Sequence, residues 1–210
     1  MAINNKCKIC RRLKTKLFLK GERCGLQKCA VTRKPYPPGQ KSKKRTPSPS
    51  EYAKELAEKQ KLRNWYGLRE KQFSGYVKAV LGKRGRAQDA SVVLIASLER
   101  RLDNTVFRLG FASQRAQARQ LVSHRHFTVN GRAVNIPSFQ VKKGDIIQVA
   151  EKAKQKLFFK NSAAGLKKYQ PPSWLKLDAK DMKGEVVDSP SLREAAPPAE
   201  ISAIFEYYSR

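Results

Sequence analysis

The sequence predicts an α+β protein with a cysteine-rich N-terminal module, an extended basic linker, a small helical domain, and an inserted module of one helix and an antiparallel sheet. Three observations predict this architecture. Four cysteines lie within the first thirty residues, apolar residues recur at helical spacing between 48 and 111, and Asn130-Gly131 lies between two short alternating runs. A chain of 210 residues is long enough for one or two domains with their own cores.

The cysteines Cys7, Cys10, Cys24 and Cys29 are spaced C-x2-C-x13-C-x4-C. Two close pairs joined by a short loop are typical ligands of one tetrahedral Zn²⁺, and four thiolates leave no open position for a catalytic water. The pattern therefore predicts one structural zinc in an N-terminal zinc module. The surrounding lysines and arginines would favour the thiolate forms. Disulfides or free thiols are the alternatives, and a cytosolic location disfavours disulfides.

The formal net charge is +28, and it is distributed unevenly. Residues 1–47 hold fifteen Lys and Arg with one acid, whereas residues 178–210 hold seven acids and four bases. So large a charge opposes folding through self-repulsion and suits a polyanionic partner, either nucleic acid or an anionic membrane. We favour nucleic acid, because no basic amphipathic helix with a bulky apolar face is evident. The start lacks a signal-peptide core, and the apolar run around 92–98 is too short to span a bilayer, so we expect a cytoplasmic protein without a membrane partner.

The linker at 33–50, RKPYPPGQKSKKRTPSPS, is rich in Pro, Gly, Ser and Lys and predicts extended chain without a core. It either becomes ordered against a polyanion or is a plain flexible linker. Ser48, with Pro49 and Glu51, then predicts a capped helix that runs to Tyr66 and ends at Gly67. A second helix is expected from about 69, closed by Gly82 and Gly85.

A third helix is predicted from about 91 to 109, with an apolar stripe that includes Leu94, Leu98 and Val106 and an opposite polar face that includes Glu99 and Arg108. Ser113 is expected to cap a further helix through about 123. The pattern Phe127–Val129, Asn130-Gly131, Arg132–Val134 predicts a hairpin, and residues 146–149 predict another strand after the turn at 143–145. We expect domains at 1–47, 48–111 and 112–177, the last with a trailing basic loop, and a C-terminal segment at 178–210 that packs back on the helical domain.

Several longer motifs carry a resemblance to a known family. They are FLKGERC at 18–24, RKPYPPGQ at 33–40, EKQKLRNWYG at 58–67, LERRLDNTVFRLGFA at 98–112, QARQLVSHRHFTVNGRAVNIPS at 117–138 and EYYSR at 206–210. Across essentially its whole length the chain resembles bacterial small-subunit ribosomal protein number four, in its four-cysteine, zinc-binding form. The resemblance implies that residues 113–149 form the small RNA-binding module named after that protein.

The resemblance further implies a structural constituent of the small ribosomal subunit. Such a protein binds ribosomal RNA early in assembly of the 5′ domain, lies where messenger RNA enters the subunit, contacts small-subunit protein number five, and influences translational accuracy. No catalytic residues, enzymatic activity or DNA partner are expected. A double-stranded RNA exposes mainly its backbone to proteins, so many cations on rigid elements are required.

The candidate RNA contacts combine cations, polar side chains and aromatic rings. They are Lys8, Arg11, Arg12, Lys16, Arg33, Lys34, Tyr36, Lys43, Lys44, Arg45, Lys59, Lys61, Arg63, Tyr66, Arg69, Arg101, Arg108, Ser113, Arg115, Arg119, Gln120, His124, Arg125, His126, Asn130, Gly131 and Arg132. Each cation could instead be an ordinary solvated surface residue, and Tyr36, Trp65 and Tyr66 could instead be packing residues. His124 and His126 are not expected to bind metal, because the cysteines already supply four ligands.

Two other functions fit parts of the sequence. An RNA-modifying enzyme, such as a pseudouridine synthase, could use the small module as an accessory. Such an enzyme needs a separate catalytic domain, and the roughly sixty residues after 150 lack a site-like cluster. A zinc-dependent DNA-binding regulator would need a recognition helix and usually a dimer seam, and neither is apparent.

Overall fold

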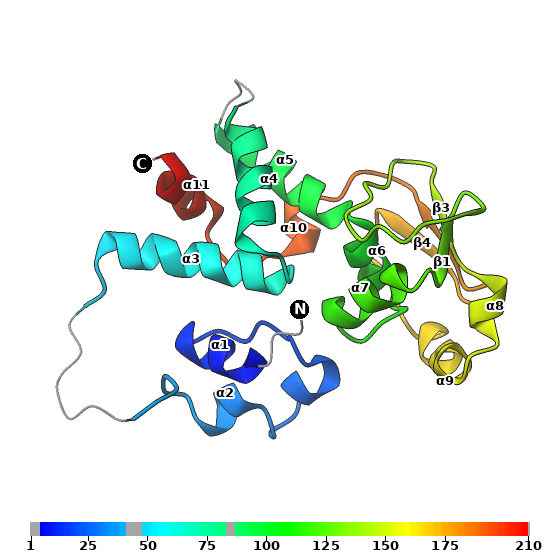
Figure 1. The fold of residues 1–210 in the computed structure, drawn as a ribbon, viewed down its shortest axis with the longest axis horizontal. Helices are drawn as coiled ribbons and strands as arrows, with labels where there is room; N and C mark the ends of the chain where they lie inside the picture. Colours follow the sequence, from blue (N-terminus) through cyan, green and yellow to red (C-terminus); the bar gives the residue numbers. More distant parts are fainter. Residues whose placement is uncertain (1–4, 41–47, 83–86, 210) are drawn as a thin grey trace. The chain divides into compact units, whose positions relative to one another are not determined.

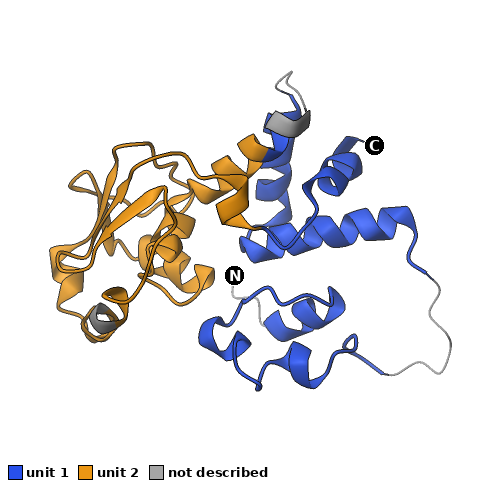
Figure 2. Cartoon of the chain, turned by 180° about the vertical axis from the view of Figure 1, so that it is seen from behind, with its two compact units in different colours: residues 1–91, 197–210 blue, residues 92–196 orange. Residues whose placement is uncertain are grey.

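The computed structural model describes residues 5–40, 48–82 and 87–209, although the side chains of 87–89 and 163–164 are not described. The predicted α+β class is confirmed, because helices are combined with one antiparallel sheet (Figure 1). The chain divides into two compact units, residues 1–91 with 197–210, and residues 92–196 (Figure 2). The boundary falls within helix α5 (Ala87–Glu99). Among the described residues, every helix is too short or too polar to cross a membrane.

The N-terminal part of the first unit consists of short elements. They are α1 (Lys6–Arg12), the 3-10 helix η1 (Gly21–Cys24) and α2 (Ala30–Arg33), and α1 contacts α2. Apart from the cysteines, Leu17 is its one fully buried apolar side chain among the described residues. Such a segment has little apolar surface with which to stabilise its own fold.

Three longer helices form the rest of the first unit, α3 (Glu51–Trp65), α4 (Glu70–Leu81) and α11 (Ile201–Ser209). The predicted cap at Ser48 is wrong by two residues. Ser50 is the N-cap, and its hydroxyl accepts a hydrogen bond from the Ala53 N–H at 3.3 Å. Gly67 does end the helix, with a φ of +65° that is easy for glycine alone. Gly85, predicted to close the next helix, lies outside the described residues.

Helix α11 packs along α3 and also contacts α4, although it follows them by more than a hundred residues. Phe73 of α4 and Tyr208 of α11 lie with their ring centroids 6.3 Å apart. The sequence predicted that the whole of 178–210 packs on these helices. In the structure α11 does so, but β4 (Leu175–Asp178) and β5 (Lys183–Val186) belong to the sheet of the second unit.

The single helix predicted over 91–109 is wrong. Helix α5 ends at Glu99, and a separate helix, α6 (Leu102–Arg108), begins after Arg101. Arg101 has extended backbone (φ −66°, ψ 136°) and forms an isolated bridge with Gln140, while the Leu102 N–H donates to the Phe139 carbonyl at 2.8 Å. This long-range pairing replaces one turn of helix. The predicted apolar stripe is nevertheless buried on both sides of the break.

The second unit contains a five-stranded antiparallel sheet in the order β2-β1-β3-β5-β4. Strands β1 (Phe127–Val129) and β2 (Arg132–Ala133) form the predicted hairpin, and β3 (Ile146–Val149) has the predicted bounds. Asn130 and Gly131 have φ values of +49° and +78°. Two positive φ values in a two-residue loop match the twist of the flanking strands.

Helices α6 and α7 (Arg115–Ser123) contact one another, and their apolar residues share one core with the sheet. Gly184 of β5 allows α6 to approach, because a Cβ there would lie 2.4 Å from a methyl carbon of Leu109. The segment predicted as a trailing basic loop instead forms α8 (Glu151–Lys154) and α9 (Leu157–Leu166), which add Ala153, Phe159 and Leu166 to the core. Helix α10 (Leu192–Ala195) follows the sheet.

Candidate nucleic-acid interface

The four cysteines surround one cavity in the N-terminal segment. Helix α1 supplies Cys7 and Cys10, Cys24 ends η1, and Cys29 immediately precedes α2. All four line a cavity of about 20 Å³, room for roughly one water-sized particle. The four side chains are free thiols, and all except Cys7 are buried. The predicted residues are thus brought together, and the disulfide alternative is not what the structure records.

The thiols differ in their surroundings. Burial raises the pKa of Cys10, and the other three cysteines act in the same direction. Burial also opposes ionisation of Cys29, but hydrogen bonds from the backbone at Val31 and Thr32 lower its pKa overall. The Lys20 N–H donates to the Cys24 sulfur at 3.4 Å. In the described ranges, no group of three or more His, Cys, Asp or Glu residues has the close arrangement of a formed metal site.

A second cavity of about 290 Å³ lies on the same segment and is lined almost entirely by cations. The lining side chains are Arg11, Arg23, Lys28, Ala30, Arg33 and Lys34. A concave surface of one charge sign concentrates the opposite charge, so this hollow suits phosphate groups. Arg23 and Lys28 were not among the predicted contacts, because their spacing along the sequence does not reveal the shared cavity.

Arg11 itself has a structural task in this hollow. Its Nε donates to the carbonyls of Lys34 and Tyr36 at 3.1 and 3.0 Å, and its guanidinium lies 4.8 Å above the Tyr36 ring. The arginine therefore fixes the chain that leaves α2. The other predicted contacts of this segment are exposed, namely Lys8, Arg12, Lys16, Arg33, Lys34 and Tyr36. Lys43, Lys44 and Arg45 lie outside the described residues.

Several predicted contacts on α3 pack against neighbouring side chains, which leaves them little surface for RNA. Lys59 is 5 % exposed, donates to Glu70 at 2.7 Å, and lies 4.2 Å from the centroid of the Tyr207 ring. Arg63 also binds Glu70, at 2.8 Å. The pKa of Glu70 is lowered although burial opposes this, because Lys59, Tyr208 and Arg63 donate hydrogen bonds to it.

Tyr66 and Trp65 are buried edge to face, so neither ring is available to stack on a base. Lys61 is paired with Glu58 within the same helix. Arg69 is exposed at the start of α4. Of the predicted contacts on these helices, Arg69 is therefore the best placed to meet a phosphate.

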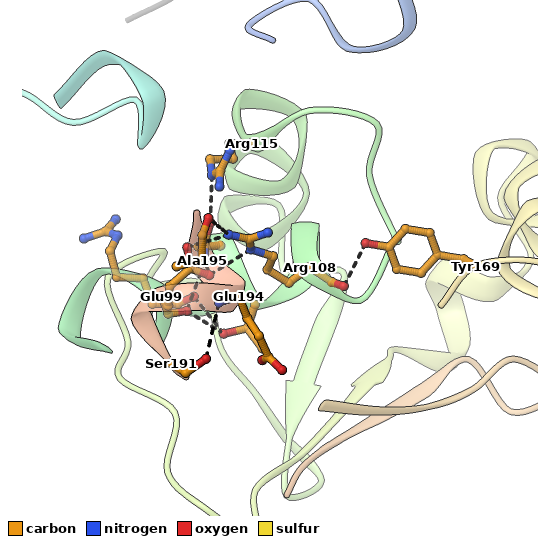
Figure 3. A network of polar contacts seen from close by, with 10 residues as sticks. Glu99, Arg108, Arg115, Tyr169, Ser191, Glu194 and Ala195 are labelled. Carbon is orange, nitrogen blue, oxygen red and sulfur yellow. Dashed lines mark hydrogen bonds and ion pairs between the residues drawn. The ribbon is translucent and has the colours of Figure 1, made fainter. Parts of the chain in front are cut away.

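Two predicted contacts on α6 are also structural. Arg101 is 1 % exposed and forms a bidentate pair with Asp103, at 3.0 and 2.8 Å. Arg108 forms a second bidentate pair with Glu99, at 2.8 and 2.9 Å, and donates to the Ala195 carbonyl at 3.0 Å (Figure 3). Glu99 is fully buried, although the sequence places it on the polar face opposite the apolar stripe.

The same network holds Arg115 at the start of α7. The Asn104 amide donates to Glu99 at 2.7 Å, and its oxygen accepts from Arg115 Nε at 2.7 Å. The guanidinium of Arg115 lies 4.6 Å above the Phe107 ring. On the far side, the Tyr169 hydroxyl donates to the Arg108 carbonyl at 3.1 Å (Figure 3). These contacts connect α5, α6, α7 and the chain after α9 into one rigid frame.

Helix α7 and the loop after it present the predicted polar residues on that frame. Gln120, His124 and Arg125 are exposed, while Arg119 and His126 are half-buried. The N–H groups of Arg125 and His126 donate to the carbonyls of Val122 and Leu121, at 2.9 and 3.2 Å. This is the Schellman pattern of a helix end, with Arg125 at the position that usually holds glycine. Its φ is +58°, a left-handed conformation that strains a residue with a Cβ.

The hairpin and the α7 start hold the remaining predicted residues. The Asn130 side chain donates to Asp145 and accepts from the Ile146 N–H, each at 2.9 Å, so its role is to fix the turn. Arg132 is exposed on β2. Ser113 does not cap α7 through its side chain, because both its N–H and its hydroxyl donate to Gln117, and Gln114 is the N-cap residue.

Besides Arg23 and Lys28, the structure adds Lys156, which sequence reasoning also missed. Lys156, which precedes α9, places its ammonium nitrogen 3.5 Å from Nε2 of His126. Burial, then Lys156, then His124 lower the pKa of His126. No sequence signal could have revealed this approach, since the two residues are thirty positions apart.

Comparisons with known proteins agree with this architecture. The sequence model of the ribosomal protein S4/S9 N-terminal domain matches residues 2–99, and that of the S4 domain matches residues 100–147. Small ribosomal subunit protein uS4 of Thermus thermophilus is 47% identical over 204 residues, which cover 97% of this chain and 96% of the relative. The chain belongs to the uS4 family. Similar relatives include uS4 of Caldicellulosiruptor bescii, 47% identical, and uS4A of Bdellovibrio bacteriovorus, 45% identical, each over 97% of this chain and 96% of the relative.

Membership of the uS4 family confirms the resemblance to bacterial small-subunit ribosomal protein number four, while the zinc-binding form stays a prediction. It is a family of structural ribosomal proteins and not of enzymes, so the alternative of an RNA-modifying enzyme is not supported. The match to the S4 domain spans α6, α7 and β1 to the start of β3, and within it α7, the loop after it and β2 carry the exposed polar residues described above.

Proposed function

We propose that this uS4 family member is a structural constituent of the small ribosomal subunit that binds ribosomal RNA. The observation that carries the proposal is the set of exposed polar residues on α7, the loop after it and the hairpin, which all rest on one rigid core. The names of the relatives place them in the small ribosomal subunit, and this chain aligns with them over nearly its whole length.

The geometry suits recognition of an RNA backbone. Arg119, Arg125 and Arg132 project from three connected elements and can meet phosphates at different points. Two acids of the same unit, Glu99 and Asp103, are engaged in structural pairs with Arg108 and Arg101. Cations held on a rigid frame read the shape of folded RNA without base-specific contacts.

We also propose that the four cysteines hold one structural Zn²⁺. They surround a single cavity, three of them are buried, and four sulfurs are a full donor set for tetrahedral zinc. Four negative sulfurs would also be balanced by the lysines and arginines nearby. Zinc bound there would fix α1, η1 and α2 together, in a segment with few apolar residues of its own. The shape of the cationic hollow would then depend on the zinc, because the metal would hold together the elements that line the hollow.

The finer roles implied by the family are proposals as well. Binding would occur early in assembly of the 5′ RNA domain, and the protein would contact small-subunit protein number five and influence accuracy. Lys43, Lys44 and Arg45 would face messenger RNA where it enters the subunit. Neutralising these three should slow translation of a structured message more than of an unstructured one, and equal slowing would refute the messenger contact.

Incorporation into ribosomes tests the main proposal. Cells that produce an epitope-tagged copy of the chain should yield small subunits whose intact mass spectrum contains the tagged protein in one copy. A variant with Arg119, Arg125 and Arg132 changed to glutamine should be depleted from these subunits when it competes with the unaltered chain. Recovery of the tagged protein only in ribosome-free fractions, or bound to DNA, would contradict the proposal and favour a DNA-binding regulator.

A further inference from the structure

The segment that carries α8 and α9 is strongly basic and was expected to be a loop. Residues 150–170 contain six lysines and one acid, Glu151. That acid is paired with Lys154 at 2.7 Å. In contrast, Lys156 and Lys160 form no ion pair with any side chain in the described ranges, and both are exposed. Of the six lysines, Lys154 is therefore paired with an acid, whereas Lys156 and Lys160 have no acidic partner among the described residues.

Lys156 and Lys160 lie one helical turn apart at the start of α9. The Lys160 N–H donates to the Lys156 carbonyl at 3.2 Å, and residues four apart lie on the same side of a helix. Phe159, between them in sequence, is fully buried and meets the His126 ring edge to face at 6.0 Å. The buried ring anchors this turn of α9 beside the loop that follows α7.

The two lysines extend the candidate interface instead of forming a separate patch. The Lys156 ammonium is 3.5 Å from His126, whose ring stacks on that of His124 at 6.1 Å. Arg125 lies between the two histidines at the exposed helix end. Two lysines, one arginine and two histidines thus lie on adjoining elements. Lys156 and His124 disfavour the charged form of His126, and a phosphate bound beside them would offset this repulsion.

We propose that the RNA-binding surface continues from the α7–β1 loop onto the start of α9, where Lys156 and Lys160 each bind a phosphate of the ribosomal RNA. This inference rests on the proposed function. The partner is a polyanion, because this turn of α9 presents exposed ammonium groups that have no acidic partners among the described residues. Leu157 and Phe158 on the same helix are 73 % and 36 % exposed, and a protein partner would instead use these apolar side chains.

A matched pair of double variants tests the proposal. Lys156→Gln/Lys160→Gln removes the two lysines of α9, and Lys176→Gln/Lys180→Gln removes two exposed lysines on and beside β4, at the opposite edge of the sheet. Both variants lose the same net charge. Urea midpoints of the two proteins should match that of the unaltered chain, since all four side chains are exposed.

Binding to purified small-subunit ribosomal RNA is then measured over a salt series. Loss of two phosphate contacts should reduce the slope of log K against log salt by about 1.8, and should weaken binding about tenfold at low salt. The β4 variant should weaken binding less than threefold. Equal slopes and affinities for the two variants would overturn the proposal. Loss of subunit incorporation in Leu157→Ser/Phe158→Ser, with the α9 lysine variant unaffected, would also overturn it and assign this turn to a protein.

The proposed function and the extension of the RNA-binding surface onto α9 can be disproved separately. If the unaltered chain binds the RNA no better than a control RNA of equal length and composition, the proposed function fails and this inference fails with it. If the unaltered chain binds specifically and the α9 lysine variant matches it, only the extension onto α9 is wrong.

Discussion

Removing Arg108 should destabilise the protein strongly and alter RNA affinity little. In Arg108→Met, the buried carboxylate of Glu99 loses two charged hydrogen bonds, of 2.8 and 2.9 Å, and the Ala195 carbonyl loses a third. Removing one partner of a buried ion pair costs about 3–5 kcal/mol, because the other charge stays buried. We therefore expect the free energy of unfolding to fall by about 4 kcal/mol.

Urea denaturation followed by circular dichroism measures this loss. Arg132→Met is the matched control, because it removes an exposed arginine of the same unit and should cost less than about 0.5 kcal/mol. A second variant isolates the mechanism. Glu99→Met/Arg108→Met should be more stable than Arg108→Met alone, since it no longer buries an unpaired charge. A loss below about 1 kcal/mol in Arg108→Met would refute the reasoning. So would a double variant less stable than the single one.

Three further expectations follow from other sites. Native mass spectrometry should find one zinc per chain, absent from Cys24→Ser, and a metal-free chain with two disulfides would contradict the zinc proposal. Arg125→Gly should raise the free energy of unfolding by up to about 1 kcal/mol, because it relieves a left-handed backbone, and should weaken RNA binding at low salt. An unchanged affinity would mean that Arg125 makes no phosphate contact. The lowered pKa of His126 means that the unfolded chain binds a proton more readily, so stability should fall as the pH drops below 6.5 while RNA affinity rises. In His126→Gln the pH dependence of stability and that of RNA affinity should both weaken. If the urea midpoint of the unaltered chain stays the same between pH 7.5 and 5.5, the prediction is contradicted.

Features determined by neighbouring residues could be predicted from the sequence. The hairpin follows from Asn130-Gly131, whose positive φ values are a local property of the turn, and the bounds of β3 follow from the turn at 143–145 that precedes it. The end of α3 followed from Gly67. The cap of that helix was misplaced because Ser48 and Ser50 are chemically alike, and only the structure shows which hydroxyl meets the Ala53 N–H.

Features determined by distant contacts could not be predicted. The apolar period continues unbroken from Leu98 to Val106, yet the helix breaks because Arg101 pairs with Gln140. Similarly, β5 joins β3 across about forty residues of sequence, and Gly184 has no side chain to reveal the close approach of Leu109.

The same distinction between local features and distant contacts applies to the candidate site. The sequence identifies the positively charged residues but not their acidic partners, and for this reason it predicts Arg101 and Arg108 as RNA contacts. Glu99 and Arg108 lie nine residues apart and meet only because α5 and α6 are separate helices. Lys156 was overlooked for the converse reason, since its approach to His126 depends on the unpredicted α9.

The central claim is that this uS4 family member recognises folded ribosomal RNA through many phosphate contacts. Its most direct test is the affinity of the full chain for small-subunit ribosomal RNA, measured against duplex DNA at equal salt and repeated over a salt series. For about ten contacted phosphates, log K should fall against log salt with a slope of about −7 to −9, and RNA should be bound more tightly than DNA throughout. A slope shallower than about −3, or equal affinity for duplex DNA, would contradict the account.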